Sequence, residues 1–248
     1  MAFFEQQSLA VMAIKGAALD VIVYERPWYT LSNDVDLIIN IQPAQISAQR
    51  DQEIKTFFNG FPGFEYEYFA HHDVSINNVL PINFSQIWAD STRISFRERR
   101  LWIMSPEDML ISACINSCRK RFFRLKSLCD IAEILTKFQE TLNWSLLIQK
   151  AKAYDCLNIV YTALFVTQMT IGCELPPDLF NRLKINPLRA SLVHFLSRRM
   201  SLSAFDSLFS GKDFLGRKID WMLLLPYATF RNYQIWRRIK YAFTFREK

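Results

Sequence analysis

Two aspartates separated by one residue, Asp34 and Asp36, are the residues of this sequence whose type and spacing point most directly to chemistry. On a β-strand, side chains at i and i+2 lie on the same face, so a strand here would present both carboxylates side by side. Two like charges at that spacing repel each other, and a divalent cation neutralises them. Because Mg²⁺ binds a few carboxylates together with substrate phosphates, the pair predicts a site for Mg²⁺ or Mn²⁺ that acts on a phosphate-bearing substrate.

An isolated Asp-x-Asp is more often a solvated strand end or a turn, so its surroundings decide. Upstream, Lys15-Gly16 separates a short apolar segment from a helical one. Glycine lets the backbone approach a phosphate, the amides of the following helix favour negative charge, and Lys15 adds a positive charge. The dipeptide alone fits an ordinary strand-to-helix turn equally well. Combined with the two aspartates, it predicts phosphate binding.

The elements that would position these residues alternate between strands and helices in the amino-terminal part. Strands are predicted from β-branched or period-two runs at 11–14, 35–41, 64–70 and 72–77, and helices at 17–24 and 43–58. After residue 104 the periodicity is helical throughout. It predicts helices at 106–120, 124–139, 144–154, 157–171, 177–183, 187–199 and 230–244, the first of them capped by Ser105 before Pro106. The sequence therefore predicts an α/β domain over residues 1–103 and an all-helical domain over residues 104–248.

Bulk composition narrows the classes of function. The chain has 248 residues, of which 50% are hydrophobic, which is enough for a large core. The net charge of +6 favours an anionic partner, although its spread over distant segments makes a nucleic-acid-binding module a weaker hypothesis. Five cysteines without a CxxC pair and only three histidines argue against structural zinc. We expect Cys114 and Cys118 to be buried free thiols. Reduced cysteines imply a cytoplasmic protein, and no signal peptide or transmembrane segment is apparent.

The order of these features resembles the polymerase-β-like nucleotidyltransferases, and one branch in particular, an uncharacterised bacterial nucleotidyltransferase family. The run 14–19 (IKGAAL), then Tyr24, then 34–38 (DVDLI) is similar to that family's pattern LKG-aal…Y…R…DiDLLV. Three later segments are also similar: 87–88 to its lW pair, 104–110 to its LsPEDlLl helix start, and 125–132 to its lrwLlDia helix. The likeness covers roughly residues 11–172.

The resemblance implies an α+β enzyme that transfers NMP from an NTP to a hydroxyl acceptor and releases pyrophosphate. The acceptor would be a small molecule, a protein or an RNA end. Residues 1–103 would form the nucleotidyltransferase domain, with a small mixed sheet, and residues 104–248 a helical domain that forms the other wall of the cleft. The cofactor would be Mg²⁺ or Mn²⁺, and the nucleotide triphosphate would be the substrate.

The resemblance also implies a third carboxylate on a later strand, often within a vDlHw segment. The best position here is Asp73, in the run 72–76 (HDVSI), with Glu65 or Glu67 as alternatives. Asp34, Asp36 and Asp73 would then be the catalytic and metal-binding residues. Lys15 and Gly16 would contact the phosphates.

Two basic clusters are further candidates for binding anions. Lys120 and Arg124, within the run 119–126, would hold the triphosphate or an anionic acceptor, although a solvated helix end explains most of that cluster equally well. Between residues 231 and 248, basic residues alternate with aromatic ones. That pattern suits RNA or an anionic lipid surface, but more often the aromatic residues pack inside and the cations stay in water.

Three positions depart from the family pattern. Thr30 stands in place of an arginine, Ser75 in place of the histidine of vDlHw, and Asn116 in place of a helix histidine. The departures at Thr30 and Asn116 favour an alternative function, a non-catalytic interaction protein or antitoxin-like partner that keeps the fold. The intact pair Asp34 and Asp36 argues against it.

Overall fold

The structure, a computed structural model, describes residues 2–24, 34–96, 99–120, 122 and 124–210, with the backbone alone for residues 2, 99 and 199–210. The helix predicted at 230–244 and the basic and aromatic cluster of the tail lie outside these residues. Thr30 lies outside them as well.

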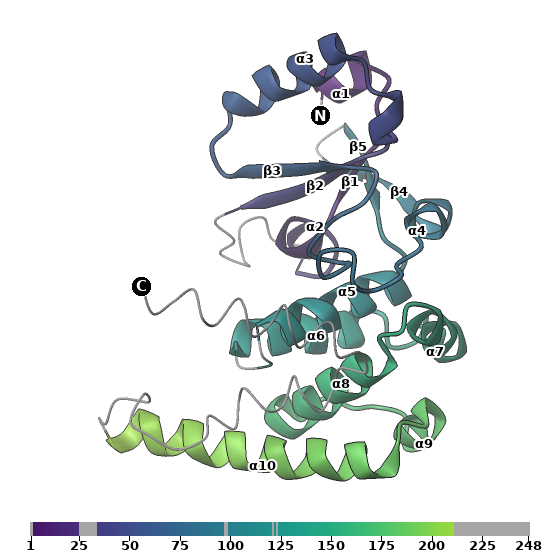
Figure 1. Ribbon diagram of the computed structural model, residues 1–248. Helices are drawn as coiled ribbons and strands as arrows, with labels where there is room; N and C mark the ends of the chain where they lie inside the picture. Colours follow the sequence, from purple (N-terminus) through teal and green to yellow (C-terminus); the bar gives the residue numbers. More distant parts are fainter. Residues whose placement is uncertain (1, 25–33, 97–98, 121, 123, 211–248) are drawn as a thin grey trace. The chain divides into compact units, whose positions relative to one another are not determined.

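Within the described residues, a five-stranded mixed sheet forms the core of the amino-terminal part (Figure 1). Its strands are β1 (Val11–Ala13), β2 (Val35–Ile39), β3 (Phe64–Tyr68), β4 (Thr92–Phe96) and β5 (Arg99–Ile103), in the order β3-β2-β1-β5-β4. β1 pairs antiparallel with β2 and parallel with β5. β2 pairs parallel with β3, and β4 pairs antiparallel with β5. The predicted α+β class with a small mixed sheet is confirmed.

Helices cover both faces of this sheet. They are α1 (Ala2–Gln6), α2 (Lys15–Ile22), α3 (Ala48–Asn59) and α4 (Phe84–Asp90). Figure 1 shows α1 and α3 on one side of the sheet and α2 on the other. The face of the sheet toward α3 is apolar, because side chains alternate along a strand and every second residue of β1 and β2 on this face is apolar. These residues belong to a buried cluster that comprises Phe4, Val11, Ala13, Ala18, Leu37, Ile39, Ile54, Phe58 and Leu101.

Among the described residues after 104, the chain is helical, as predicted. Its helices are α5 (Pro106–Arg119), α6 (Leu125–Lys137), α7 (Trp144–Ala153), α8 (Leu157–Ile171), α9 (Leu179–Leu183) and α10 (Pro187–Ser210). Two compact units divide the chain: residues 1–78, 82–112 and 133–144 form the first, and residues 79–81, 113–132 and 145–248 the second. The first unit includes residues beyond 103. This division follows other limits than the predicted domains, 1–103 and 104–248, which stay a prediction.

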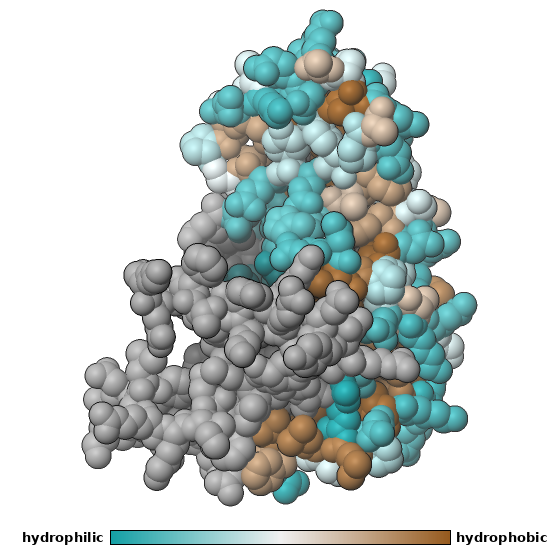
Figure 2. All heavy atoms as spheres, in the orientation of Figure 1, coloured by the Kyte–Doolittle hydropathy of each residue, from teal (hydrophilic) through white to brown (hydrophobic). Residues whose placement is uncertain are grey.

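In the second unit, aromatic side chains pack between α8 and α10. The His194 ring stacks on Phe165 with centroids 4.1 Å apart, and its Nε2 lies 3.0 Å from the hydroxyl of Tyr161. Some apolar side chains of these two helices remain at the surface, among them Leu192 and Phe195. Figure 2 shows hydrophobic residues at the surface in the lower part of the view, where α10 lies.

Several sequence predictions of elements are corrected by the structure. The strand predicted at 72–77 is wrong: this segment is a series of turns, in which Ile76, Asn77 and Asn78 all have positive φ (+50°, +54° and +62°). Asparagine tolerates this left-handed backbone, which a strand cannot contain. The helix predicted at 43–58 begins later, as α3 at Ala48, because the Ser47 hydroxyl caps it by accepting a hydrogen bond from the amide of Arg50. No prediction was made for α1, α4, β4 or β5.

The structure describes no helix that is long and apolar enough to cross a membrane. All five cysteines carry free thiols. Cys114 and Cys118 are buried, which confirms the prediction for these two, and Cys156 is buried as well. Burial raises the pKa of the Cys114 thiol well above its usual value, so this thiol is protonated and unreactive at neutral pH.

Candidate active site

The turn between β1 and α2 brings the first elements of the site together. The amide of Ile14 donates to the backbone carbonyl of Asp36, 3.1 Å away, so the end of β1 is fastened to β2 beside this aspartate. Lys15 follows with a positive φ of +51°, and Gly16 is buried at the start of α2. The left-handed residue of the turn is therefore Lys15 itself. Ile14, at the N-cap, has no polar side-chain atom, so its side chain cannot cap the first amides of the helix.

Asp36 is the buried carboxylate of the site, with 3% of the residue exposed. It lies in β2 between Val35 and Leu37, and strand alternation turns it to the face opposite these two residues. Lys15 Nζ lies 2.8 Å from Asp36 Oδ1 and 2.7 Å from Asp73 Oδ2. One ammonium therefore bridges two carboxylates from distant parts of the chain.

Ionisation in this cluster is shaped by two opposing effects. Burial alone would lower the pKa of Lys15, but its hydrogen bonds to Asp36 and Asp73 outweigh burial, and the pKa is raised above 10.5. Burial alone would raise the pKa of Asp36, but the contacts with His71 and Lys15 outweigh it, and the pKa is lowered below 3.8. At neutral pH, Lys15 and Asp36 are thus a charged pair.

Asp73 reaches Lys15 from a turn and not from the strand that the sequence predicted. The turn is held by local hydrogen bonds: the amide of Ser75 donates to the carbonyl of His71 at 3.2 Å, and that of Asn77 to the carbonyl of His72 at 2.7 Å. The Ser75 hydroxyl also donates to the carbonyl of His71 and accepts from the amide of Asn78. Ser75 therefore fixes the turn that presents Asp73.

Sequence reasoning missed His71 and His72 as site residues. His71 is buried, with its Nε2 3.4 Å from Asp36 Oδ1 and 3.6 Å from Glu67 Oε1. His72 Nδ1 contacts Glu67 Oε1, and its Nε2 lies 3.0 Å from Asp73 Oδ1. Glu67, which the sequence offered as an alternative third carboxylate, thus lies in the same cluster as Asp73. The signal for the histidines was the His-His pair directly before Asp73, which holds two of the three histidines of the chain.

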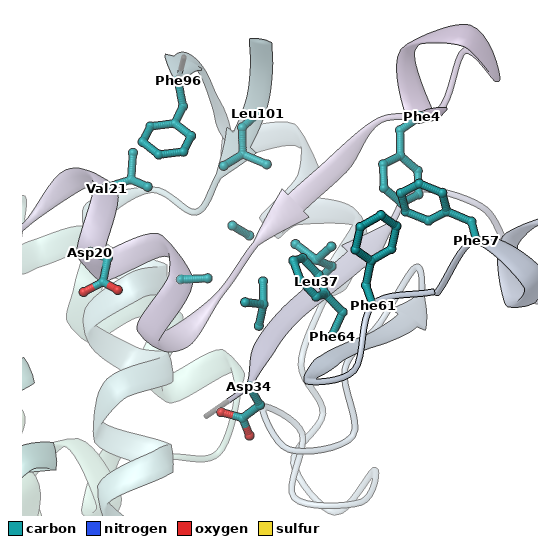
Figure 3. A pocket seen from close by; sticks show the side chains of 13 residues that line it. Phe4, Asp20, Val21, Asp34, Leu37, Phe57, Phe61, Phe64, Phe96 and Leu101 are labelled. Carbon is teal, nitrogen blue, oxygen red and sulfur yellow. The ribbon is translucent and has the colours of Figure 1, made fainter. Parts of the chain in front are cut away.

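Asp34 is exposed at the residue before β2 and lines a different hollow (Figure 3). This pocket has a volume of about 330 Å³ and an apolar lining, to which Val35 and Leu37 contribute. Figure 3 shows the carboxylate of Asp34 directed away from the aromatic side chains of the pocket. Because Asp34 precedes the first residue of β2, strand alternation does not fix its direction. Its place beside Asp36 at a metal stays a prediction.

The predicted phosphate contacts of the helical part also stay predictions. Lys120 and Arg124 are both exposed and belong to the second unit, Lys120 just after α5 and Arg124 just before α6. Asn116, which stands in place of a histidine of the family pattern, is half-buried on α5.

The donor atoms of the cluster fit a hard divalent cation. Asp36 and Asp73 offer carboxylate oxygens that share one cation position, because the same ammonium contacts both. Mg²⁺ and Mn²⁺ prefer such oxygen ligands. Lys15 lies where a cation between these two oxygens would lie, so ion and lysine would compete for the position.

Comparison with known proteins follows this geometry. A family model described as an uncharacterised nucleotidyltransferase matches residues 70–172. This similarity, over less than half of the chain, supports a nucleotidyltransferase superfamily assignment. The matched residues include His71, His72 and Asp73, whereas Lys15, Asp34 and Asp36 lie before them.

A crystal structure described as an antigenic nucleotidyltransferase-like protein from Paracoccidioides brasiliensis aligns with a TM-score of 0.46 and 17% identity. The alignment covers 73% of this chain and 87% of that chain. No curated protein is similar enough to be matched.

Proposed function

We propose that the protein is a metal-dependent nucleotidyltransferase that transfers NMP from an NTP to a hydroxyl acceptor with release of pyrophosphate. The observation that supports this most strongly is the convergence of Asp36 and Asp73 on one cation position beside the Lys15-Gly16 turn. The superfamily assignment supplies the reaction class. Asp36 and Asp73, which meet at this cation position, are residues suited to that reaction.

Asp36 and Asp73 would hold the divalent ion, with Asp34 as the third predicted ligand. A bound Mg²⁺ or Mn²⁺ supplies electrostatic stabilisation of the charge that develops on the transferred and leaving phosphates. Asp36, buried and kept ionised by its neighbours, is the fixed anchor of the set. Asp73, whose side chain is 16% exposed, is the carboxylate better placed to accept a proton from an acceptor hydroxyl.

Lys15 has two roles in this proposal. In the metal-free protein its ammonium neutralises the two carboxylates, which would otherwise repel each other at close range. If a divalent ion took that position, the ammonium would be free to bind a phosphate oxygen as a point charge. The amides at the start of α2, next to buried Gly16, favour the same anion.

Lys120 and Arg124 remain candidates for binding the triphosphate or the acceptor, which would be a small molecule, a protein or an RNA end. Both side chains carry positive charge and are exposed to solvent, as a contact with a mobile anionic substrate requires.

A label-transfer assay tests the proposal. Each α-labelled NTP is incubated with the protein, Mg²⁺ or Mn²⁺, and candidate small molecules, proteins or RNA as acceptors. We expect label on one class of acceptor for the wild type, and a loss of at least about 100-fold for Asp36→Asn and Asp73→Asn. Asp178→Asn is the matched control, since it makes the same change at an exposed carboxylate of the second unit. Circular dichroism checks folding. Metal-dependent transfer that survives in Asp36→Asn would contradict the proposal.

A non-catalytic interaction protein is the second candidate, and one observation favours it. Lys15 already serves as an internal counter-ion for Asp36 and Asp73, so this cluster is stable without a metal. If the protein is non-catalytic, NTP with Mn²⁺ should leave its melting temperature unchanged. A rise that requires both ligands favours the enzyme.

A further inference from the structure

His71 is the most buried titratable residue of the candidate active site, with 2% of the residue exposed. It lies between Asp36 and Glu67, and the reaction proposed above assigns it no role. A buried imidazole must satisfy both ring nitrogens, so the partners of each nitrogen indicate where its proton lies.

The Nδ1 atom of His71 is an acceptor. The backbone amide of Asp73 donates to it at 3.1 Å. An amide nitrogen has no lone pair to accept with, so Nδ1 must be unprotonated for this bond to form. A neutral imidazole carries its single proton on the other nitrogen, and His71 is therefore the Nε2–H tautomer.

The Nε2–H group faces carboxylates. Its nearest carboxylate oxygens are Asp36 Oδ1 at 3.4 Å and Glu67 Oε1 at 3.6 Å. These distances are longer than an ideal hydrogen bond of about 2.9 Å, so the contact with Asp36 is a directed electrostatic attraction in a buried setting. This contact adds to the hydrogen bond from Lys15, so two different side chains restrict the orientation of the Asp36 carboxylate.

The same tautomer argues against histidine ligation of a metal. The ligand atoms of Glu67, His71 and His72 lie within 4.8 Å of one another, a spacing that could hold an ion. However, a protonated Nε2 has no lone pair for a metal, and Nδ1 is engaged by the amide of Asp73. Coordination by His71 would require this amide bond to break.

We propose that His71 is a positioning residue, which orients the metal-binding carboxylate of Asp36 through Nε2–H and is not itself a metal ligand. The proposal rests on the proposed function, and it narrows the metal: the site takes a hard cation through carboxylate oxygens, Mg²⁺ or Mn²⁺, and not Zn²⁺ through imidazole nitrogens. Partners of this kind hold ligating groups in many metal sites, and their loss typically weakens metal affinity or activity about 10- to 100-fold.

Nitrogen NMR of the histidine rings in the full-length, metal-free protein tests the tautomer without any activity. The spectrum of His71→Gln identifies the His71 signals by their loss. We expect one protonated nitrogen, Nε2, and one unprotonated nitrogen, Nδ1, with Nε2 still protonated after Mg²⁺ or Zn²⁺ is added. A proton on Nδ1, or loss of the Nε2 proton when Zn²⁺ binds, would overturn the proposal.

Substitutions test the positioning role. His71→Gln keeps an N–H donor near the position of Nε2, whereas His71→Leu removes it. We expect His71→Leu to weaken Mn²⁺ binding in the presence of a non-hydrolysable NTP by about 10- to 100-fold, and His71→Gln to restore it to within about threefold of wild type. For transfer, kcat should fall more than KM for the NTP rises, since the carboxylate and not the nucleotide contact is disturbed.

His194→Gln, in the second unit, is the control and should leave all these values unchanged. Equal damage in His71→Gln and His71→Leu, at unchanged melting temperature, would overturn the positioning role. If the wild type transfers no nucleotide at all, the proposed function fails, and the NMR result still decides the tautomer.

Discussion

The central feature of the molecule at the scale of single residues is one lysine shared by two acidic side chains. Asp36 is almost fully buried, and an unpaired charge there would cost several kcal/mol. Lys15 removes that cost in the metal-free protein, and its own raised pKa keeps it charged over the physiological range. A site built to exchange this ammonium for a divalent ion would be both stable and reactive.

Lys15→Met tests the exchange directly. Without the ammonium, Asp36 and Asp73 repel each other, so we expect the free energy of unfolding in EDTA to fall by about 3 kcal/mol. Mn²⁺ alone should bind about tenfold more tightly than to the wild type, because no lysine must be displaced, and should restore the melting temperature. Transfer activity should still decline, since the phosphate loses a positive partner.

Calorimetric titration of Mn²⁺ measures the effect, and Lys55→Met is the matched control. Lys55 pairs with Asp51 on the exposed side of α3, where an ion pair contributes little. Unchanged Mn²⁺ affinity in Lys15→Met would show that ion and lysine do not compete.

At the scale of elements, sequence patterns predicted the residues of the candidate site better than the strands and turns that hold them. The buried strands near Asp36 were predictable because a short apolar run such as 35–39 leaves few alternatives. β5 was missed because Arg99 and Arg100 mask its apolar residues, although it pairs directly with β1. Asp73 was assigned to a strand because residues 72–77 are partly β-branched, and only the backbone of Asn77 reveals the turn.

Sequence patterns also predicted some residues of the candidate site and not others. Asp36 and Lys15 could be predicted from the Asp-x-Asp and Lys-Gly motifs, and Asp73 from the resemblance to the family. His71 could not, because its role depends on a ring nitrogen that meets the amide of Asp73 across a turn. No linear pattern records that contact.

Helix α8 ends at a glycine whose conformation is required. Gly172 has φ of +83°, and its amide donates to the carbonyl of Gln168. A Cβ at this position would meet nothing within 4 Å, so backbone strain is the only cost of a side chain. We expect Gly172→Ala to lower the free energy of unfolding by about 1 kcal/mol, and Gly172→Asn to lower it less.

Urea unfolding measures this difference. Gly60→Ala is the matched control, since Gly60 ends α3 with an ordinary φ of −78° and its added Cβ would lie 3.4 Å from the carbonyl of Phe57. Equal losses for the two alanine variants would contradict the assignment of a left-handed cap to Gly172.

At the scale of the whole molecule, stability should depend on pH through His194. Burial, and then the charge of Arg198, lowers the pKa of His194 below its usual 6.5. The unfolded chain therefore binds the proton more readily, so the stability contributed by neutral His194 is fully present above pH 6.5 and is lost as pH falls through the folded pKa.

Unfolding at pH 7.5, 6 and 5 tests this dependence. The wild type should lose stability over this range, and His194→Gln should lose less, because it carries no titrating ring. An identical decline in both proteins would assign the pH dependence to other groups.

The proposed function depends on a divalent ion that would join Asp36 and Asp73 to the nucleotide. The most direct measurement is the melting temperature of the full-length protein with a non-hydrolysable NTP, with Mn²⁺ or with EDTA, for the wild type, Asp36→Asn and the control Asp178→Asn. We predict that the nucleotide stabilises the wild type and the control only when Mn²⁺ is present, by about 2.7 kcal/mol at a ligand concentration 100 times Kd, and that Asp36→Asn gains nothing. Equal stabilisation in EDTA, or an undiminished gain in Asp36→Asn, would contradict it.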